Sequence, residues 1–267
     1  MLFAAGRGTR LAPLTDRHPK CLVTAGNKTL LEHNILKLKA AGVKTLVINV
    51  HHFAEQVIEF VRSNDFGLAI QISEEQELLG QGGGLLYASE HFKNEEAFLV
   101  CNSDIFTDLD LGSLISAHAE STRLATLAVA KRETSRYLRF DQNNNLCGWE
   151  NRKTGEKISW SDNSYDNWAF NGIQIISPKI FDYMHDLGTF FSTIPVYLKA
   201  AQAGENIKAI PMGQSYWIDI GTVEKLEALR QYLQEEENTP SRDLIADPEE
   251  RNKGFIMTQL HYDIAII

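Results

Sequence analysis

Apolar residues in the first 105 positions fall into short continuous runs separated by amphipathic segments. Continuous runs are typical of strands buried on both faces, whereas apolar residues three and four positions apart indicate helices that bury one face. The runs predict strands over residues 46–50, 68–72 and 97–101, and the amphipathic segments predict helices over 30–41 and 54–62. This alternation predicts βαβ units and therefore an α/β fold with a doubly wound, mainly parallel sheet.

The pattern is less regular after residue 105. It predicts helices over 110–121, 178–185, 192–203 and 223–235, strands over 124–130, 170–176 and 207–212, and a hairpin over 137–150. The glycine-rich stretch 80–84 is expected to be a loop before a helix at 85–90, and the polar stretch 153–167 is also expected to be a loop. Residues 1–234 are predicted to form one domain, and 235–267 a charged linker with an unassigned tail.

A locally basic, glycine-containing segment follows the first three residues. Gly6 and Gly8 permit positive φ angles, and successive backbone N–H groups in such a turn form a concave anion site. Arg10 can donate two parallel hydrogen bonds to a phosphate, and Lys20 adds a point charge. Because the whole chain has a net charge of −9, this basic loop predicts a small ligand that carries phosphate.

Two aspartates far apart in the sequence also suggest ligand binding. Asp104 directly follows the strand predicted over 97–101, and Asp219 precedes Gly221. Ligands of doubly wound sheets bind at the carboxyl ends of the strands, and carboxylates suit hard cations. Either aspartate alone is equally well explained as a cap or turn residue, and only the combination with the basic loop favours a shared site.

The segment Ala4-Ala5-Gly6-Arg7-Gly8-Thr9-Arg10-Leu11-Ala12-Pro13-Leu14-Thr15, followed by Pro19-Lys20, resembles the signature of the sugar-1-phosphate nucleotidyltransferases. The resemblance extends over about residues 1–234. It implies a Rossmann-like, doubly wound, mixed but mainly parallel sheet with helices on both faces. It also implies magnesium-dependent transfer of a nucleoside monophosphate from a nucleoside triphosphate to a sugar 1-phosphate, with release of pyrophosphate.

The same resemblance implies roles for individual residues. The catalytic residues would be Arg10, Lys20, Asp104 and Asp219, with Asp104 and Asp219 holding Mg²⁺ or Mn²⁺. The nucleotide would be bound by Ala4, Ala5, Gly6, Gly8, Thr9, Arg10, Gln81, Gly82 and Gly83. The sugar phosphate would be bound by Lys20, Arg139, Asn171 and Gly172, although a hairpin or core role explains Arg139 at least as well. Ser103 stands where relatives often have glycine, so its hydroxyl is expected beside the metal.

The residues around Gln81 bear on the identity of the base and the sugar. Gln81 before three glycines offers an amide that suits the imide edge of uracil, and the acids Glu74, Glu75 and Glu77 are expected to lie outside contact range. This favours UTP over GTP, with N-acetylmuramic acid 1-phosphate as acceptor in cell-wall recycling. Mannose-1-phosphate guanylyltransferases and glucose-1-phosphate thymidylyl- or uridylyltransferases are the alternatives, and a non-catalytic nucleotide-sugar-binding regulator is an alternative of another class.

Composition bears on the partners and the cellular setting of the protein. The acidic balance argues against nucleic acid as a partner, and no apolar run reaches the ~20 residues of a membrane span. Cys21, Cys101 and Cys147 are far apart without paired spacing, so a reducing, cytoplasmic setting is expected. The apolar run before the loop is shorter than a typical strand, so either a short strand or a longer natural start is expected. Monomer and homo-oligomer both remain open.

Overall fold

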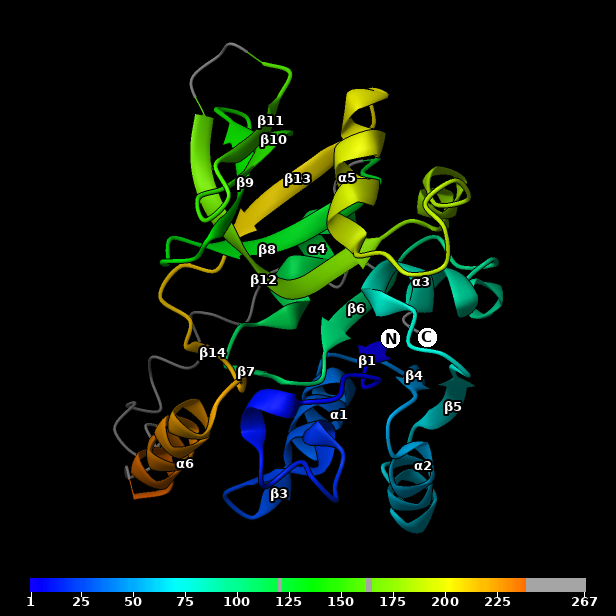
Figure 1. Cartoon of the computed structure of the whole chain (residues 1–267), viewed down its shortest axis with the longest axis vertical. Coiled ribbons are helices and arrows are strands. Elements are labelled where there is room, and N and C mark those ends of the chain that lie inside the picture. Colours follow the sequence, from blue (N-terminus) through cyan, green and yellow to red (C-terminus); the bar gives the residue numbers. More distant parts are fainter. Residues whose placement is uncertain (120–121, 162–164, 239–267) are drawn as a thin grey trace, which may run out of the picture.

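The computed structural model describes residues 1–119, 122–161 and 165–238, so the tail over 239–267 lies outside the described residues. One half of its large sheet is parallel, in the order β5–β4–β1–β6 (Figure 1). The strands are β1 (Leu2–Phe3), β4 (Thr45–Val50), β5 (Ala69–Glu74) and β6 (Phe98–Asn102). The helices in this half are α1 (Leu30–Ala40), α2 (Ala54–Ser63) and α3 (Gly80–Tyr87). The βαβ prediction for this part of the chain is confirmed.

Beyond β6 the sheet becomes antiparallel. The long strand β12 (Tyr165–Ile176) pairs with β6 and, through its first residues, with β9. The sheet then extends in the order β9 (Arg136–Asp141), β10 (Leu146–Asn151) and β11 (Glu156–Ser159). It also pairs with β8 (Ala125–Ala130), which is parallel to β13 (Ile207–Pro211). The sheet is therefore mixed, with its parallel half carrying the N-terminal loop.

Two apolar cores lie on opposite faces of this sheet. In β4, Leu46, Ile48 and Val50 point into one core, and Val47 points into the other. The first core includes side chains from α1, α2 and α4 (Leu111–Ala119), and the second includes side chains from α3 and α5 (Thr193–Gln202). Because successive strand residues face opposite sides, an uninterrupted apolar strand can bury both faces. The prediction of a doubly wound sheet with helices on both faces is confirmed.

A smaller unit joins the last helix to the N-terminal part. Strand β7 (Ile105–Thr107) pairs with β14 (Trp217–Asp219), and β2 (Thr24–Ala25) pairs with β3 (Lys28–Thr29). Helix α6 (Val223–Asn238) packs Leu226 and Leu229 into a third core with Leu11. Short 3₁₀ turns cover Thr9–Leu11, Lys20–Leu22, Ser89–His91 and Pro178–Tyr183.

Several predicted boundaries are wrong. The stretch 153–167, expected to be a loop, contains β11 and the start of β12. Strand β11 is at the edge of the sheet and the first residues of β12 pair with β9 alone, so polar side chains there can face water. Helix α6 runs to Asn238, past the helix end predicted at residue 235. The segment expected as a helix over 178–185 is a 3₁₀ turn.

The glycine-rich stretch is also helical, contrary to expectation. Helix α3 begins at Gly80, and the buried Glu75 carboxylate accepts a hydrogen bond from the Leu79 N–H at 3.1 Å just before it. A Cβ at Gly82 would lie 2.4 Å from the Phe191 ring, and one at Gly83 would lie 2.3 Å from the Thr189 carbonyl oxygen. Close packing against residues 189–192 therefore overrides the low helix propensity of glycine.

None of the helices within the described ranges combines the length and apolar character that a membrane crossing requires.

Leu127 supplies a test of the central core, since its side chain in β8 is fully buried. Replacing Leu127 by alanine should lower the free energy of unfolding by about 2–5 kcal/mol, because the substitution loses apolar burial and leaves a cavity. Urea titration followed by circular dichroism measures the change. Leu36→Ala is the matched control at a position 37% exposed on α1, and an equal loss at both positions would contradict the assigned core.

Candidate active site

The N-terminal loop leaves the sheet beside the end of β6. Strand β1 pairs with β6 in register, with Phe3 opposite Asn102, so the loop and the Asn102-Ser103-Asp104 segment start from adjacent strand ends. The buried Ser103 hydroxyl donates to the Phe3 carbonyl oxygen at 2.7 Å, and the Ala4 N–H donates to the Asn49 side-chain oxygen at 2.9 Å. These bonds fix the exit direction of the loop. The hydroxyl of Ser103 is therefore bound to the backbone, whereas the sequence predicted it beside the metal.

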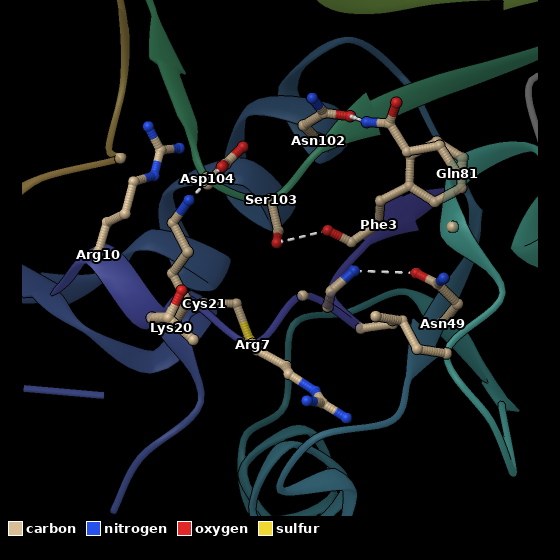
Figure 2. Close-up of a pocket in the computed structure, with 18 of the residues that line it drawn as sticks. Phe3, Arg7, Arg10, Lys20, Cys21, Asn49, Gln81, Asn102, Ser103 and Asp104 are labelled. Carbon is tan, nitrogen blue, oxygen red and sulfur yellow. Dashed lines mark hydrogen bonds and ion pairs between the residues drawn. The ribbon is translucent and has the colours of Figure 1, made fainter. Parts of the chain in front are cut away.

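A cavity of about 410 Å³ lies over these strand ends (Figure 2). The predicted nucleotide-binding residues that line it are Ala4, Ala5, Gly6, Gly8, Thr9, Arg10 and Gln81, and Lys20, Asp104 and Gly221 line it as well. The structure thus brings the basic loop, the first aspartate and the Gly221 turn to one cavity. Gly82 and Gly83 are not among its lining residues.

The loop folds back on Lys20. Gly8 has φ +64°, and a Cβ there would lie 2.8 Å from the Lys20 Cβ. The Thr15 hydroxyl donates to the Gly8 carbonyl oxygen at 2.9 Å and closes the turn. A side chain at position 8 would be strained by the positive φ and would displace Lys20. Gly8 is therefore required by the turn itself.

The pairing of β7 with β14 joins the two aspartates. Asp219 stands opposite Ile105, and the Ile220 N–H donates to the Asp104 carbonyl oxygen at 2.7 Å. The two carboxylates, separated by 114 intervening residues in the chain, are thus held on neighbouring backbones. Their side chains are about one-third exposed, at 30% and 32%.

Each carboxylate already has a lysine partner. Lys20 forms an ion pair with Asp104, and Lys225 forms one with Asp219. Figure 2 shows Lys20 directed at Asp104, with Arg10 beside this pair and Arg7 turned away. The Arg10 guanidinium lies close to Gly221 and Asp219, since a Cβ at Gly221 would be 3.0 Å from Arg10 Nη2 and 3.4 Å from Asp219 Oδ2.

Lys225 was not predicted from the sequence. It lies in the first turn of α6, where its N–H donates to the Thr222 hydroxyl at 3.4 Å. Thr222 followed three residues later by Lys225 is compatible with a helix start, but the spacing alone does not reveal that the ammonium group reaches back to Asp219.

Gln81 lies at the opposite end of the cavity. Its side-chain nitrogen donates to the Asn102 side-chain oxygen at 2.7 Å, which commits one N–H of the amide to the protein (Figure 2). The N–H groups of Gly82 and Gly83 donate to the Phe191 carbonyl oxygen at 2.9 and 3.4 Å. These glycine amides are therefore used in packing, contrary to the expectation that they would lie against a nucleobase.

The residues predicted to bind the sugar phosphate are divided by the structure. Arg139 is buried in β9, where it forms an ion pair with Glu150 at 2.6 Å and stacks on Tyr165, so the structure does not bring it to the cavity with the other predicted site residues. The Asn171 side chain is fully buried and engaged, since its oxygen accepts from Arg132 and its nitrogen lies 2.6 Å from the Met212 sulfur. Gly172, with φ +74°, packs against Asn102, where a Cβ would lie 2.6 Å from the side-chain nitrogen.

Arg132 is a second residue that the sequence did not reveal. Its guanidinium lies over the Trp217 ring, 4.3 Å from the centroid, and Trp217 precedes Asp219 by two residues on β14. Desolvation by burial lowers the pKa of Arg132, and the charge of Asp219 is the largest opposing influence. The neighbourhood of Asp219 therefore contains three cationic side chains.

Cys21 also lines the cavity but does not supply a reactive thiolate. Burial raises the pKa of its thiol to about 12, and the thiol is therefore protonated near neutral pH.

The donor set at Asp104 and Asp219 fits Mg²⁺. The described residues contain no cluster of three or more histidine, cysteine or acidic side chains suited to a metal, so an all-protein cage is absent from that part of the chain. Mg²⁺ typically takes one or two carboxylates together with substrate phosphate oxygens. Two adjacent, partly exposed carboxylates beside a basic loop match that requirement.

The chain belongs to the nucleotidyl transferase family, whose profile matches residues 1–236. A mannose-1-phosphate guanyltransferase of Yarrowia lipolytica is 31% identical over 227 residues, which is 83% of this chain and 60% of that protein. The catalytic subunit beta of a Danio rerio mannose-1-phosphate guanylyltransferase is 36% identical over 141 residues, 51% of this chain and 39% of that protein. The chain thus spans less than two thirds of the length of these relatives.

Solved structures show the same fold at lower identity. An inositol-1-phosphate CTP transferase from T. maritima superposes with a TM-score of 0.71 at 20% identity, covering 90% of this chain and 96% of that one. HddC from Yersinia pseudotuberculosis gives 0.70 at 22% identity, covering 87% of this chain and 97% of that one. The predicted family and fold are both confirmed.

Removing the lysine at Asp219 should strengthen divalent metal binding. Lys225→Met should lower the dissociation constant of the nucleotide-free protein for Mn²⁺ about 1.4–5-fold, since a partly exposed ion pair that competes for the carboxylate contributes about 0.2–1 kcal/mol. Electron paramagnetic resonance of free Mn²⁺ measures the constant. Asp104→Asn should weaken binding in the same assay.

Lys93→Met is the matched control, because Lys93 forms a similar ion pair with Glu90 and its loss changes the net charge equally. Unchanged or weaker Mn²⁺ binding in Lys225→Met would argue that Asp219 is not a ligand.

Proposed function

We propose that this chain is an enzyme that transfers a nucleoside monophosphate from a nucleoside triphosphate to a sugar 1-phosphate. The observation that carries the proposal is the convergence of the basic loop, Lys20 and Asp104 at one cavity, with Asp219 held on the neighbouring backbone. A phosphate oxygen of the sugar 1-phosphate attacks the α-phosphorus, the bond to the bridging oxygen breaks, and pyrophosphate leaves with that oxygen. The nucleotide-sugar is the second product, and no protein side chain is attached at any stage.

The protein contributes orientation and charge to this reaction. Arg10 and the N–H groups of the loop bind the departing pyrophosphate, and Lys20 holds phosphate close to the reacting centre. Asp104 and Asp219 would hold Mg²⁺, which supplies Lewis-acid stabilisation of negative charge on the phosphates when bound. Preorganised charges of this kind stabilise a transition state because they need no reorganisation during the reaction.

For the base, we propose uracil. The only carboxylate that lines the cavity is Asp104, among the residues that the structure describes. Glu75 is buried behind the Asn49 amide, which donates to it at 2.5 Å, so it offers no acceptor to the donor pair of guanine. The side-chain oxygen of Gln81, which accepts no hydrogen bond from the residues that the structure describes, can instead accept from the single imide N–H of uracil. N-acetylmuramic acid 1-phosphate is the proposed acceptor, in cell-wall recycling and in the cytoplasm.

GTP with mannose 1-phosphate is the second candidate, favoured by the names of the relatives from Yarrowia lipolytica and Danio rerio. A regulator that binds nucleotide-sugars without turnover is the candidate of another class, and it is disfavoured by the intact set of charged residues. All three are separated by one assay, in which ATP, CTP, GTP, UTP and dTTP are each combined with glucose, mannose and N-acetylmuramate 1-phosphates.

Release of pyrophosphate in that assay should require Mg²⁺ or Mn²⁺ and should depend on Arg10. Arg10→Ala should lower kcat/KM about 10–150-fold, as expected for loss of a charged hydrogen bond worth about 1.5–3 kcal/mol. Arg17→Ala, at an exposed position outside the cavity lining, is the control and should change kcat/KM by less than about twofold. No pyrophosphate from any combination would refute the enzyme, and equal effects of the two substitutions would refute the assigned loop geometry.

Gln81→Ala should reduce discrimination between UTP and GTP by about 1–3 kcal/mol, because it removes a polar partner from the base. Competition between the two nucleotides for the same enzyme gives the ratio of kcat/KM values directly. Gln76→Ala removes the same side chain at an exposed position before α3 and should leave the ratio unchanged. A wild-type ratio in favour of GTP would replace the uracil assignment with guanine.

A further inference from the structure

Arg132, Asn171 and Trp217 form a closed set of contacts outside the lining of the nucleotide cavity. Arg132 Nε donates to the Asn171 side-chain oxygen at 2.9 Å, and the Trp217 indole N–H donates to the Asn171 carbonyl oxygen at 3.0 Å. Arg132 Nη2 also donates to the Phe170 carbonyl oxygen at 2.9 Å. The guanidinium is thus held on one face by an indole ring and along one edge by two acceptors from β12.

This anchoring leaves donors unused. A guanidinium has five N–H donors, and within the described part of the chain two of them are bonded to protein acceptors. The side chain is only half-buried, so its remaining edge is accessible to a ligand. A fixed, partly desolvated arginine with a free edge has the geometry for a phosphate group.

The position of Arg132 relative to Asp219 indicates which phosphate. Gly221, two residues after Asp219, lines the nucleotide cavity, whereas Trp217, two residues before it, contacts Arg132. Asp219 therefore lies between the cavity and Arg132 along this segment. A phosphate bound by Arg132 would therefore lie near Asp219 and outside the residues that line the nucleotide cavity.

The charges around the two aspartates also favour a phosphate site at Arg132. Lys20 and Lys225 are each paired with one carboxylate, so these four groups are neutral together. Arg7 and Arg10 in the cavity lining and Arg132 near Asp219 then provide the excess positive charge. The two arginines of the cavity suit the triphosphate, and Arg132 remains for the phosphate of a second anionic substrate.

We propose that Arg132 binds the phosphate of the acceptor sugar 1-phosphate and that Asn171 acts as its positioning residue. The proposal rests on the proposed function and adds a specificity-determining contact to it. Asn171, which the sequence suggested as a direct sugar ligand, acts through Arg132 because its own side chain is fully engaged inside the protein.

The test separates the two substrates kinetically. With the best nucleotide and acceptor from the pyrophosphate assay, Arg132→Gln should raise KM for the sugar 1-phosphate about 10–100-fold and change KM for the nucleotide by less than about threefold. Arg132→Lys keeps the charge but loses the planar fork, so its KM should fall between those of the wild type and Arg132→Gln. Arg136→Gln, at an exposed position nearby in the sequence, is the matched control and should leave both constants unchanged.

Calorimetric titration of glucose 1-phosphate, mannose 1-phosphate and N-acetylmuramate 1-phosphate into protein saturated with a non-hydrolysable nucleotide provides a second measurement. The Arg132→Gln dissociation constant should rise by the same factor as KM, and Asn171→Ser should give a smaller rise in the same direction. An unchanged constant, or an equal loss of nucleotide binding, would overturn the role of Arg132. If Arg132→Gln does not fold, the KM of Arg132→Lys for the sugar 1-phosphate is the test. A wild-type KM in that variant would refute the proposed contact between the planar guanidinium and the phosphate. Absence of turnover in the wild type with every acceptor would instead refute the proposed function.

Discussion

The pairing of β7 with β14 is the contact on which the candidate site depends. Asp104 follows β6 of the parallel half of the sheet, and Asp219 lies near the other end of the described chain, after the antiparallel half is complete. The short antiparallel ladder and the bond from Ile220 N–H to the Asp104 carbonyl oxygen place both carboxylates on one edge. Helix α6 follows immediately and shares an apolar core with Phe106 of β7 and Ile218 of β14, and this packing stabilises the ladder.

The two carboxylates carry like charges on neighbouring backbones, and cations from the surrounding elements offset these charges. Lys20 reaches Asp104 from the loop, and Lys225 reaches Asp219 from α6, so each carboxylate receives a cation from a different element. The ammonium groups thus stabilise the site in the absence of a metal, and a divalent cation that binds there must compete with them for carboxylate oxygens.

Much of this arrangement could be predicted from the sequence because the signals are local. The loop residues are contiguous, and the strand before Asp104 is an uninterrupted apolar run, so their positions at a sheet edge follow from pattern and topology. Lys225 and Arg132 escaped prediction because their partners are set by tertiary contacts. Arg132 follows a strand in an unremarkable charged segment, and only the packing of β12 against β8 and the approach of β14 give it Asn171 and Trp217 as neighbours.

The sequence also suggested Arg139 as a phosphate ligand because its residue type suits a phosphate. In the structure Arg139 lies in β9, where its ion pair with Glu150 neutralises it inside the protein. The sequence provides the residue type, but long-range strand order decides whether a cation faces a ligand or a buried carboxylate.

Glycine shows the same distinction within a single residue type. Gly8 permits the tight turn of the N-terminal loop. Gly82 and Gly83 instead allow α3 to approach residues 189–192 so closely that a methyl group would meet the Phe191 ring or the Thr189 carbonyl. That packing still affects the cavity, because Phe190 and Gln81 line it from the two packed segments. The α3 glycines therefore shape the cavity through the position of these neighbours, although Gly82 and Gly83 do not themselves line it.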